Sequence, residues 1–168
     1  MAGQRTRMLQ EATIEGNKLF GELDSHTPPE VTKKMEEAQG GRFMAGQIMV
    51  GIEALKASLK VLGPSTSVLA AYGAKQGQYV QIDVKESQQD KQGNTFAVHY
   101  SYTGEITSVK EDEAKMGSKP GCTIEISPSA YKKTENGKII YNLNEETQEL
   151  DLGQGDIMAE HRRNIGRS

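Results

Sequence analysis

Side chains that could catalyse a reaction or bind a metal ion are few in this sequence and lie far apart. The histidines are not at metal-ligand spacing from one another or from the single cysteine. They are His26, His99 and His161. Gly117 and Ser118 do not form a nucleophile elbow, because Lys119 and Pro120 stand where that motif needs a further glycine. We therefore predict that the chain is not an enzyme, with no catalytic residue, no cofactor and no metal.

Two further features could in principle do chemistry. The run Glu111-Asp112-Glu113 could bind a cation, although such a run is more often a solvated loop, and we favour the loop. Cys122 alternates with two isoleucines up to residue 126, which is typical of a buried small hydrophobic residue and not of a nucleophile.

The composition indicates one domain over residues 1–168, with residues 1–10 a mobile arm unless assembled. The hydrophobic fraction is 35%, with no Trp and three Phe, so neighbouring molecules are expected to supply part of the stability. A net charge of -3 argues against a basic nucleic-acid binder, and one cysteine excludes an internal disulfide. No signal peptide or membrane anchor is predicted, and we expect synthesis in a cytoplasm.

Alternation of apolar and polar residues predicts strands with one buried face. The strands are expected over residues 48–52, 55–61, 80–84, 96–102 and 122–126. Gly16-Asn17 and Asn136-Gly137 predict hairpin turns, and Thr103-Gly104 predicts a bulge or bend. Polar residues predict a turn over 86–94 and a loop over 110–121.

Two short helices complete the prediction. One covers residues 65–72, with Gly73 just past its end, and the other begins at Asp156 as the cap and ends at Gly166. The predicted fold is a mainly β antiparallel sandwich or barrel with two short helices.

Several segments together resemble the major tail tube protein family of contractile-tailed bacteriophages. The most informative read Val-Thr-Lys-Lys-Met-Glu-Glu-Ala-Gln-Gly-Gly at 31–41 and Ala-Glu-His-Arg-Arg-Asn-Ile-Gly at 159–166. Between them, in the family's order, come Val50-Gly51-Ile52-Glu53-Ala54-Leu55, Tyr72-Gly73, Lys119-Pro120-Gly121 and Asn136-Gly137. The resemblance runs from about Ile14 to Gly166, and the chain is also similar to the tube protein of R-type pyocins.

This resemblance implies a tail tube fold whose sheets join across subunits into a hexameric barrel. Stacked rings would enclose a channel for DNA, which passes without specific binding. The implied partners are other copies of the chain, the contractile tail sheath protein, and the baseplate and tail terminator proteins. The implied place is the virion tail, assembled in the cytoplasm of the host bacterium.

Two alternatives remain open from the sequence. The first is the tube subunit of a phage-tail-like bacteriocin or a type VI secretion-like injection machine, in which the subunit does the same job. The second is a small monomeric β-sandwich binding module.

Three groups of residues are expected to serve assembly. Ring or subunit contacts are expected in the loop 39–47, unless Phe43 folds back onto its own core; the residues are Gly40, Gly41, Arg42, Phe43 and Met44. Polar strand positions, with Glu36 or Glu53 offsetting the lysines, are candidates to line the channel: Lys34, Glu36, Lys56, Ser58 and Lys60. Charged outer residues are candidates to face the sheath: Glu111, Asp112, Glu113, Arg162 and Arg163.

Overall fold

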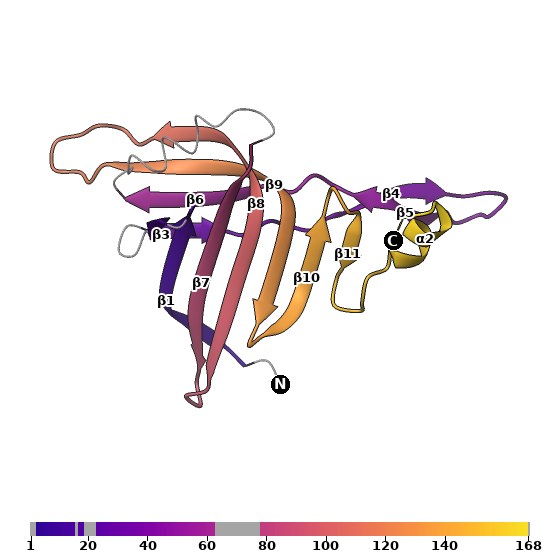
Figure 1. The fold of residues 1–168 in the computed structure, drawn as a ribbon, viewed down its shortest axis with the longest axis horizontal. Coiled ribbons are helices and arrows are strands. Elements are labelled where there is room, and N and C mark those ends of the chain that lie inside the picture. Colours follow the sequence, from indigo (N-terminus) through magenta and orange to yellow (C-terminus); the bar gives the residue numbers. More distant parts are fainter. Residues whose placement is uncertain (1–2, 16, 19–22, 63–77, 168) are drawn as a thin grey trace.

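The chain folds almost entirely into antiparallel β-strands (Figure 1). The computed structural model describes residues 3–15, 17–18, 23–62 and 78–167. The elements within them are β1 (Arg5–Ile14), β2 (Asn17–Lys18), β3 (Leu23–Thr27), β4 (Lys33–Ala38), β5 (Gly46–Ile52), β6 (Ala57–Leu62), β7 (Val80–Asp90), β8 (Thr95–Glu111), β9 (Gly121–Glu135), β10 (Lys138–Asn144), β11 (Glu149–Asp151) and α2 (Ala159–Asn164). The mainly β, antiparallel fold class predicted from alternation is confirmed.

Two long strands, β8 and β9, bend, so that the nine-stranded sheet is folded into two parts that cross each other, and we name each part as a sheet. Residues 95–103 and 130–135 belong to a sheet in the order β11-β10-β9-β8-β7-β1-β2, which we call the main sheet. The remaining parts of β8 and β9 pair together, and β9 continues to β6 and β3, forming the crossed sheet. The register shifts between Thr103 and Gly104, so the predicted bulge is confirmed, and it lies where β8 bends from one sheet to the other (Figure 1).

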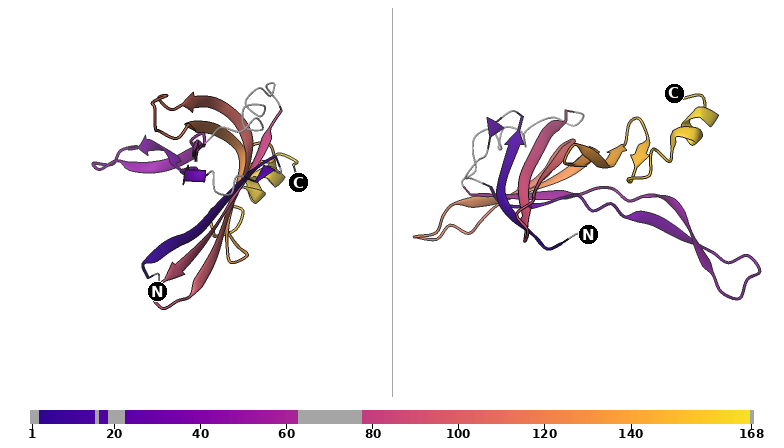
Figure 2. Two further views of the ribbon diagram at one scale, coloured as in Figure 1. Left: turned by 90° about the vertical axis from the view of Figure 1, so that its left-hand side faces the viewer. Right: turned by 90° about the horizontal axis from the view of Figure 1, so that it is seen from below.

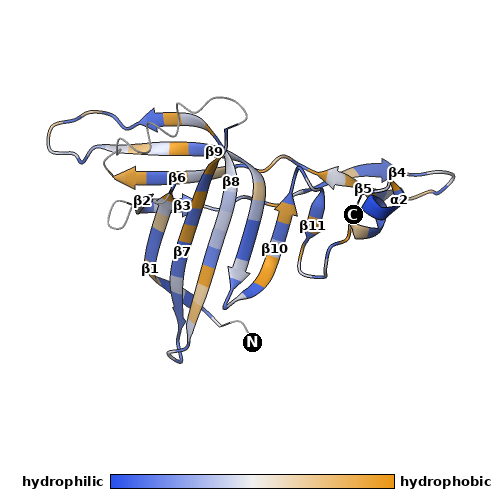
Figure 3. Ribbon diagram, viewed as in Figure 1, coloured by the Kyte–Doolittle hydropathy of each residue, from blue (hydrophilic) through white to orange (hydrophobic). Residues whose placement is uncertain are grey.

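The core lies where the two sheets pack together, and it uses alternate residues of each strand. Bands of hydrophobic and hydrophilic residues therefore alternate along the strands (Figure 3). The largest fully buried side chains come from both sheets: Tyr102, Tyr131, Ile14, Leu59, Ile82, Ile124, Ile126, Val61, Val84 and Cys122. Cys122 is thus a buried hydrophobic residue, as predicted.

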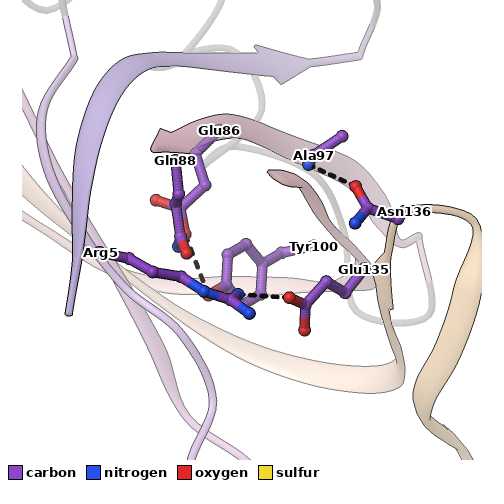
Figure 4. A network of polar contacts seen from close by, with 7 residues as sticks. All are labelled: Arg5, Glu86, Gln88, Ala97, Tyr100, Glu135 and Asn136. Atoms are coloured by element: carbon purple, nitrogen blue, oxygen red, sulfur yellow. Dashed lines mark hydrogen bonds and ion pairs between the residues drawn. The ribbon is translucent and has the colours of Figure 1, made fainter. Parts of the chain in front are cut away.

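A polar seam interrupts the core near β1. Glu86 is buried, and its carboxylate accepts hydrogen bonds from Arg7, Gln10, Gln88 and the Tyr100 hydroxyl. Figure 4 shows Glu86 beside Gln88 and Tyr100. Because the Glu86 carboxylate has hydrogen-bond partners within the sheet, the polar residues around it can continue the strand and need not form a turn. The predicted turn over 86–94 was wrong in extent: β7 continues to Asp90 and the turn is confined to residues 91–94.

Both predicted hairpins are confirmed where the structure describes them. Asn136 and Gly137 have φ angles of 51° and 82°, the left-handed pair that a two-residue hairpin turn requires. The Asn136 side chain also accepts a hydrogen bond from the Ala97 N–H at 2.8 Å, which ties this turn to β8 (Figure 4). In the N-terminal hairpin, Ile14 pairs with Asn17.

Strands β4 and β5 form a separate two-stranded sheet that projects from the body as an arm (Figure 2). Residues 39–45 connect them at the tip. The arm pairs with no other strand in the described part of the chain. An isolated two-stranded ribbon is marginal in water, so this arm is expected to gain stability from a partner.

The ends of the chain differ in part from the predictions. Residues 5–10 belong to β1, which pairs with β7 except at Met8, whereas we expected a mobile arm over residues 1–10 unless the chain is assembled. Helix α2 starts at Ala159 and has no side-chain cap, so the prediction that Asp156 caps it was wrong. The Asp156 carboxylate instead accepts from the backbone of Leu150 and Met158. The predicted helix over 65–72 lies outside the described residues. Within the described residues, no helix is long and apolar enough to cross a membrane.

His26 on β3 makes the fold sensitive to acid. Its ring lies against Tyr100 and Tyr102 and is 3.1 Å from the Tyr102 hydroxyl. Burial lowers the pKa of His26 from 6.5 to about 4, with Glu86 raising it and Arg7 lowering it by smaller amounts. The unfolded chain takes up this proton near pH 6.5 and the folded chain resists it, so stability falls as pH drops between these values.

We expect this histidine to cost about 3 kcal/mol of stability between pH 7 and pH 4. Urea unfolding of the native chain and of His26→Gln at both pH values measures it. The glutamine can still bond the Tyr102 hydroxyl but takes up no proton, so its loss of stability should be smaller. Equal losses in the two proteins would contradict the assignment.

Candidate assembly surfaces

The described residues include no group of three or more His, Cys, Asp or Glu side chains placed to hold a metal ion. His26 is half-buried against Tyr100 and Tyr102, and His99 lies 3.2 Å from Asp83 across neighbouring strands. His161 is exposed on α2. The three histidines therefore lie apart from one another. The other candidate sites are surfaces suited to contacts with other protein chains.

The arm carries the most exposed apolar side chains. At its tip, Phe43 is 104% exposed and Met44 is 82% exposed, so Phe43 does not fold back onto its own core. Gly40 and Gly41 have φ angles of 41° and 71°, which form the tight turn that leads into Phe43. Arg42 closes this turn through its backbone N–H to Gln39.

The exposed apolar surface continues down both strands of the arm. Met35 and Met49 lie opposite each other, and Ile48 and Val50 are also exposed. The arm thus offers apolar groups along its length as well as at the tip that the sequence indicated. Such a surface is typical of an interface between protein chains.

The face of the main sheet that points away from the core is almost entirely polar. Its cross-strand rows pair opposite charges or mix them with hydroxyl and amide groups. Glu11 lies opposite Lys85, and Ser101 lies opposite both Asp83 and Lys132. His99 and Asp83 also pair on this face. We call it the polar face; it combines nearly balanced charge with small side chains.

The predicted channel-lining residues do not share one surface. Lys34 and Glu36 lie on the arm, whereas Lys56, Ser58 and Lys60 lie on or just before β6 in the crossed sheet. Alternation identifies a polar side of each strand but not the sheet that the strand joins, so our expectation that some of these five line the channel stays a prediction. Lys60 is offset by Asp24 at 4.0 Å, and not by Glu36 or Glu53 as we expected.

The predicted sheath-facing residues occupy two exposed regions. Glu111 ends β8, and Asp112 and Glu113 begin a loop that is shorter than predicted, spanning residues 112–120. Arg163 is exposed on α2. Arg162 differs, because its guanidinium lies 2.5 Å from Asp156 and donates to the Gln148 carbonyl. This pair lowers the pKa of Asp156 to about 2. The contacts of Arg162 with Asp156 and Gln148 hold α2 against the preceding segment.

Comparison with known proteins gives these surfaces a context. Residues 9–166 match the family described as phage tail tube protein FII. The chain belongs to this family. The match spans both sheets, the arm and α2, so the whole described fold is that of a tail tube protein.

Two curated relatives agree with this. The tail tube protein of Escherichia phage P2 is 26% identical over 171 residues, covering 99% of each chain. The major tail tube protein of Serratia phage KSP20 is 29% identical over 134 residues, covering 77% of each. The chain is therefore a tail tube protein, a structural component of a phage tail, as the resemblance implied.

A solved structure supports the fold. The sheath/tube terminator of the extracellular contractile injection system PVC has a TM-score of 0.60 to this tail tube protein, with 10% identity. It covers 75% of this chain and 93% of the other. The tail tube fold therefore recurs in a contractile machine of another kind.

The polar face is the feature that sequence reasoning missed. Its residues alternate with the core residues of the same strands, for example Gln81, Asp83 and Lys85 between Val80, Ile82 and Val84. That alternation was visible in the sequence. The balance of charge along β1, β7, β8 and β9 is the signal that could have identified the polar face. Only the strand order, however, shows that these strands are neighbours.

Proposed function

We propose that this tail tube protein assembles into rings around a central channel, and that the rings stack into a tube through which DNA passes. The observation that carries the proposal is the arm, which projects from the body with apolar side chains exposed from base to tip. A monomer gains nothing from such an arm, whereas a subunit of a stacked assembly can bury it against the next subunit. The six-membered ring is part of this proposal.

The polar face is our proposed channel wall. DNA carries a dense negative charge, so a wall rich in lysine would retain it and a nearly neutral wall would let it pass. The rows of the polar face pair Glu11 with Lys85 and place His99 beside Asp83. We propose the polar face in place of the candidates named from the sequence, which are Lys34, Glu36, Lys56, Ser58 and Lys60.

The residues at the arm tip, Gly40, Gly41, Arg42, Phe43 and Met44, are our proposed contact between subunits of successive rings. The loop with Glu111, Asp112 and Glu113, together with Arg163, is our proposed contact with a contractile sheath. Arg162 would support that contact by holding α2 in place. Baseplate and terminator proteins would bind the two ends of the tube, and assembly would take place in the host cytoplasm.

Electron microscopy of the purified chain tests this function. We expect rings or tubes with a central channel, and sedimentation that depends on protein concentration. A monomer at all concentrations, with no rings, would favour a small binding module and contradict the proposal. Neighbouring genes decide between a phage and a bacteriocin or injection machine, because only a phage has capsid genes.

A further inference from the structure

The arm, which projects from the body (Figure 2), carries three of the seven methionines of the chain. Met35 on β4 is 40% exposed and lies opposite Met49 on β5, which is 36% exposed. Met44, in the connection at the tip, is 82% exposed. Met158, by contrast, is half-buried and packs against the core. The arm therefore gathers thioether groups on a ribbon that pairs with no other strand in the described part of the chain.

The chemical state of these sulfur atoms decides whether the surface of the arm is apolar. A methionine side chain is unbranched, flexible and apolar, which suits it to a contact between proteins. Oxidation converts its thioether into a sulfoxide, which is polar. A polar group that is buried without a hydrogen-bond partner opposes association. The same three residues that make the arm apolar are therefore the ones at which an oxidant can make it polar.

The single cysteine is a poor competitor for the same oxidant. Cys122 is buried in the core, and burial, with the nearby charges of Glu111 and Asp112, raises the pKa of its thiol. The thiolate is the form that reacts, so a protonated and buried thiol reacts slowly. Exposed methionines are thus the favoured targets, and those outside the arm in the described residues, Met8 and Met116, lie in two separate places.

We propose that the arm is a site of methionine oxidation that controls assembly, with hydrogen peroxide converting Met35, Met44 and Met49 of the free subunit to sulfoxides. A subunit with an oxidised arm no longer assembles. In a finished tube the neighbouring subunit covers the arm, so the same oxidant reaches these thioethers more slowly. This inference rests on the proposed role of the arm as a contact and names a modification that switches the contact off.

The reaction at each residue is a two-electron oxidation. The thioether sulfur attacks one oxygen of hydrogen peroxide, the O–O bond breaks and an S–O bond forms. The proton of the transferred hydroxyl passes to the departing hydroxide, which leaves as water. Methionine sulfoxide reductases reverse this oxidation, so the effect on assembly is reversible.

Peroxide treatment of the free subunit tests the proposal. The native chain is treated with hydrogen peroxide below the concentration at which it assembles, the peroxide is removed, and mass spectrometry locates the sulfoxides. Sedimentation then measures the concentration needed for assembly, which should rise about tenfold or more because buried sulfoxides lack partners. Treatment with methionine sulfoxide reductases should restore it. The three side chains lie outside the core, so circular dichroism should show a folded subunit throughout.

Two leucine variants identify the residues responsible, because leucine has a similar volume and cannot be oxidised in this way. One combines Met35→Leu, Met44→Leu and Met49→Leu, and the matched control combines Met8→Leu and Met116→Leu. Each variant is compared with its own untreated sample, so any effect of leucine on the contact itself cancels. Peroxide should change the assembly of the arm variant little and should impair the control as it impairs the native chain.

The outcomes separate this inference from the proposed function. It would be overturned if the arm methionines stayed unoxidised in the free subunit, or if native chain oxidised at all three sites assembled as before. Equal sensitivity of the arm variant and the control would also overturn it, while leaving the proposed tube intact. An untreated native chain that forms no rings under any condition would overturn both.

Discussion

Tubes should fail to form when Phe43→Ala and Met44→Ala are combined. The two side chains are almost completely exposed at the end of an arm that has no other strand partner within the described residues. Burial of a large apolar side chain stabilises a contact by about 1.5–3 kcal/mol, so losing both should weaken each contact on the order of 100-fold or more. Sedimentation and electron microscopy at the concentration where the native chain forms tubes measure the effect.

The control for this prediction is Met116→Ala. Met116 is as exposed as Phe43 but lies in the loop after β8, away from the arm. This variant should form tubes like the native chain, and all the subunits should remain folded because none of the three side chains contributes to the core. Tubes of native length and stability from the double variant would show that the arm tip does not carry the contact.

Gly104→Ala is expected to cause the largest loss of stability in the subunit itself. A Cβ atom at this position would lie 2.4 Å from the Ser127 carbonyl oxygen and 2.6 Å from the Pro128 Cα atom. Both are backbone atoms of the adjacent strand β9, so no side-chain rotation can relieve the clash. The bend of β8 between the two sheets would have to open, at a cost of about 3 kcal/mol or more.

Urea unfolding at neutral pH measures this loss, with Gly51→Ala as the matched control. Gly51 also lies in a strand, β5, but an added Cβ atom there meets nothing within 4 Å. The control should unfold within about 0.5 kcal/mol of the native chain. Should Gly104→Ala unfold at the native urea concentration, the close approach of β8 and β9 described here would be incorrect.

Local patterns in the sequence were sufficient for the strands and turns. Alternation over 80–84 and 122–126 predicted buried faces that the structure has, because the period of two is a property of the strand itself. Asn136-Gly137 predicted its hairpin because few residue pairs adopt two successive left-handed conformations. The ordered set of segments at 31–41 and 159–166 identified the family.

These local patterns did not predict where each strand lies in the fold. Lys34 and Lys60 both follow polar alternation, yet one lies on the arm and the other in the crossed sheet, because strand pairing is decided by contacts distant in sequence. Glu86 looked like part of a turn, and only the approach of Arg7 and Tyr100 makes its burial possible. Arg162 looked like a free surface charge until Asp156 was placed beside it.

The sequence by itself determined that this chain is a β-rich tail tube protein, since hydropathy period, turn chemistry and family motifs are all local. Only the tertiary structure decided which strands are neighbours. That order brings balanced charges together on the polar face and leaves the arm unpaired, with its methionines exposed. The physical reason is that a surface for assembly is made by long-range pairing, whereas each strand that forms it is specified within a few residues.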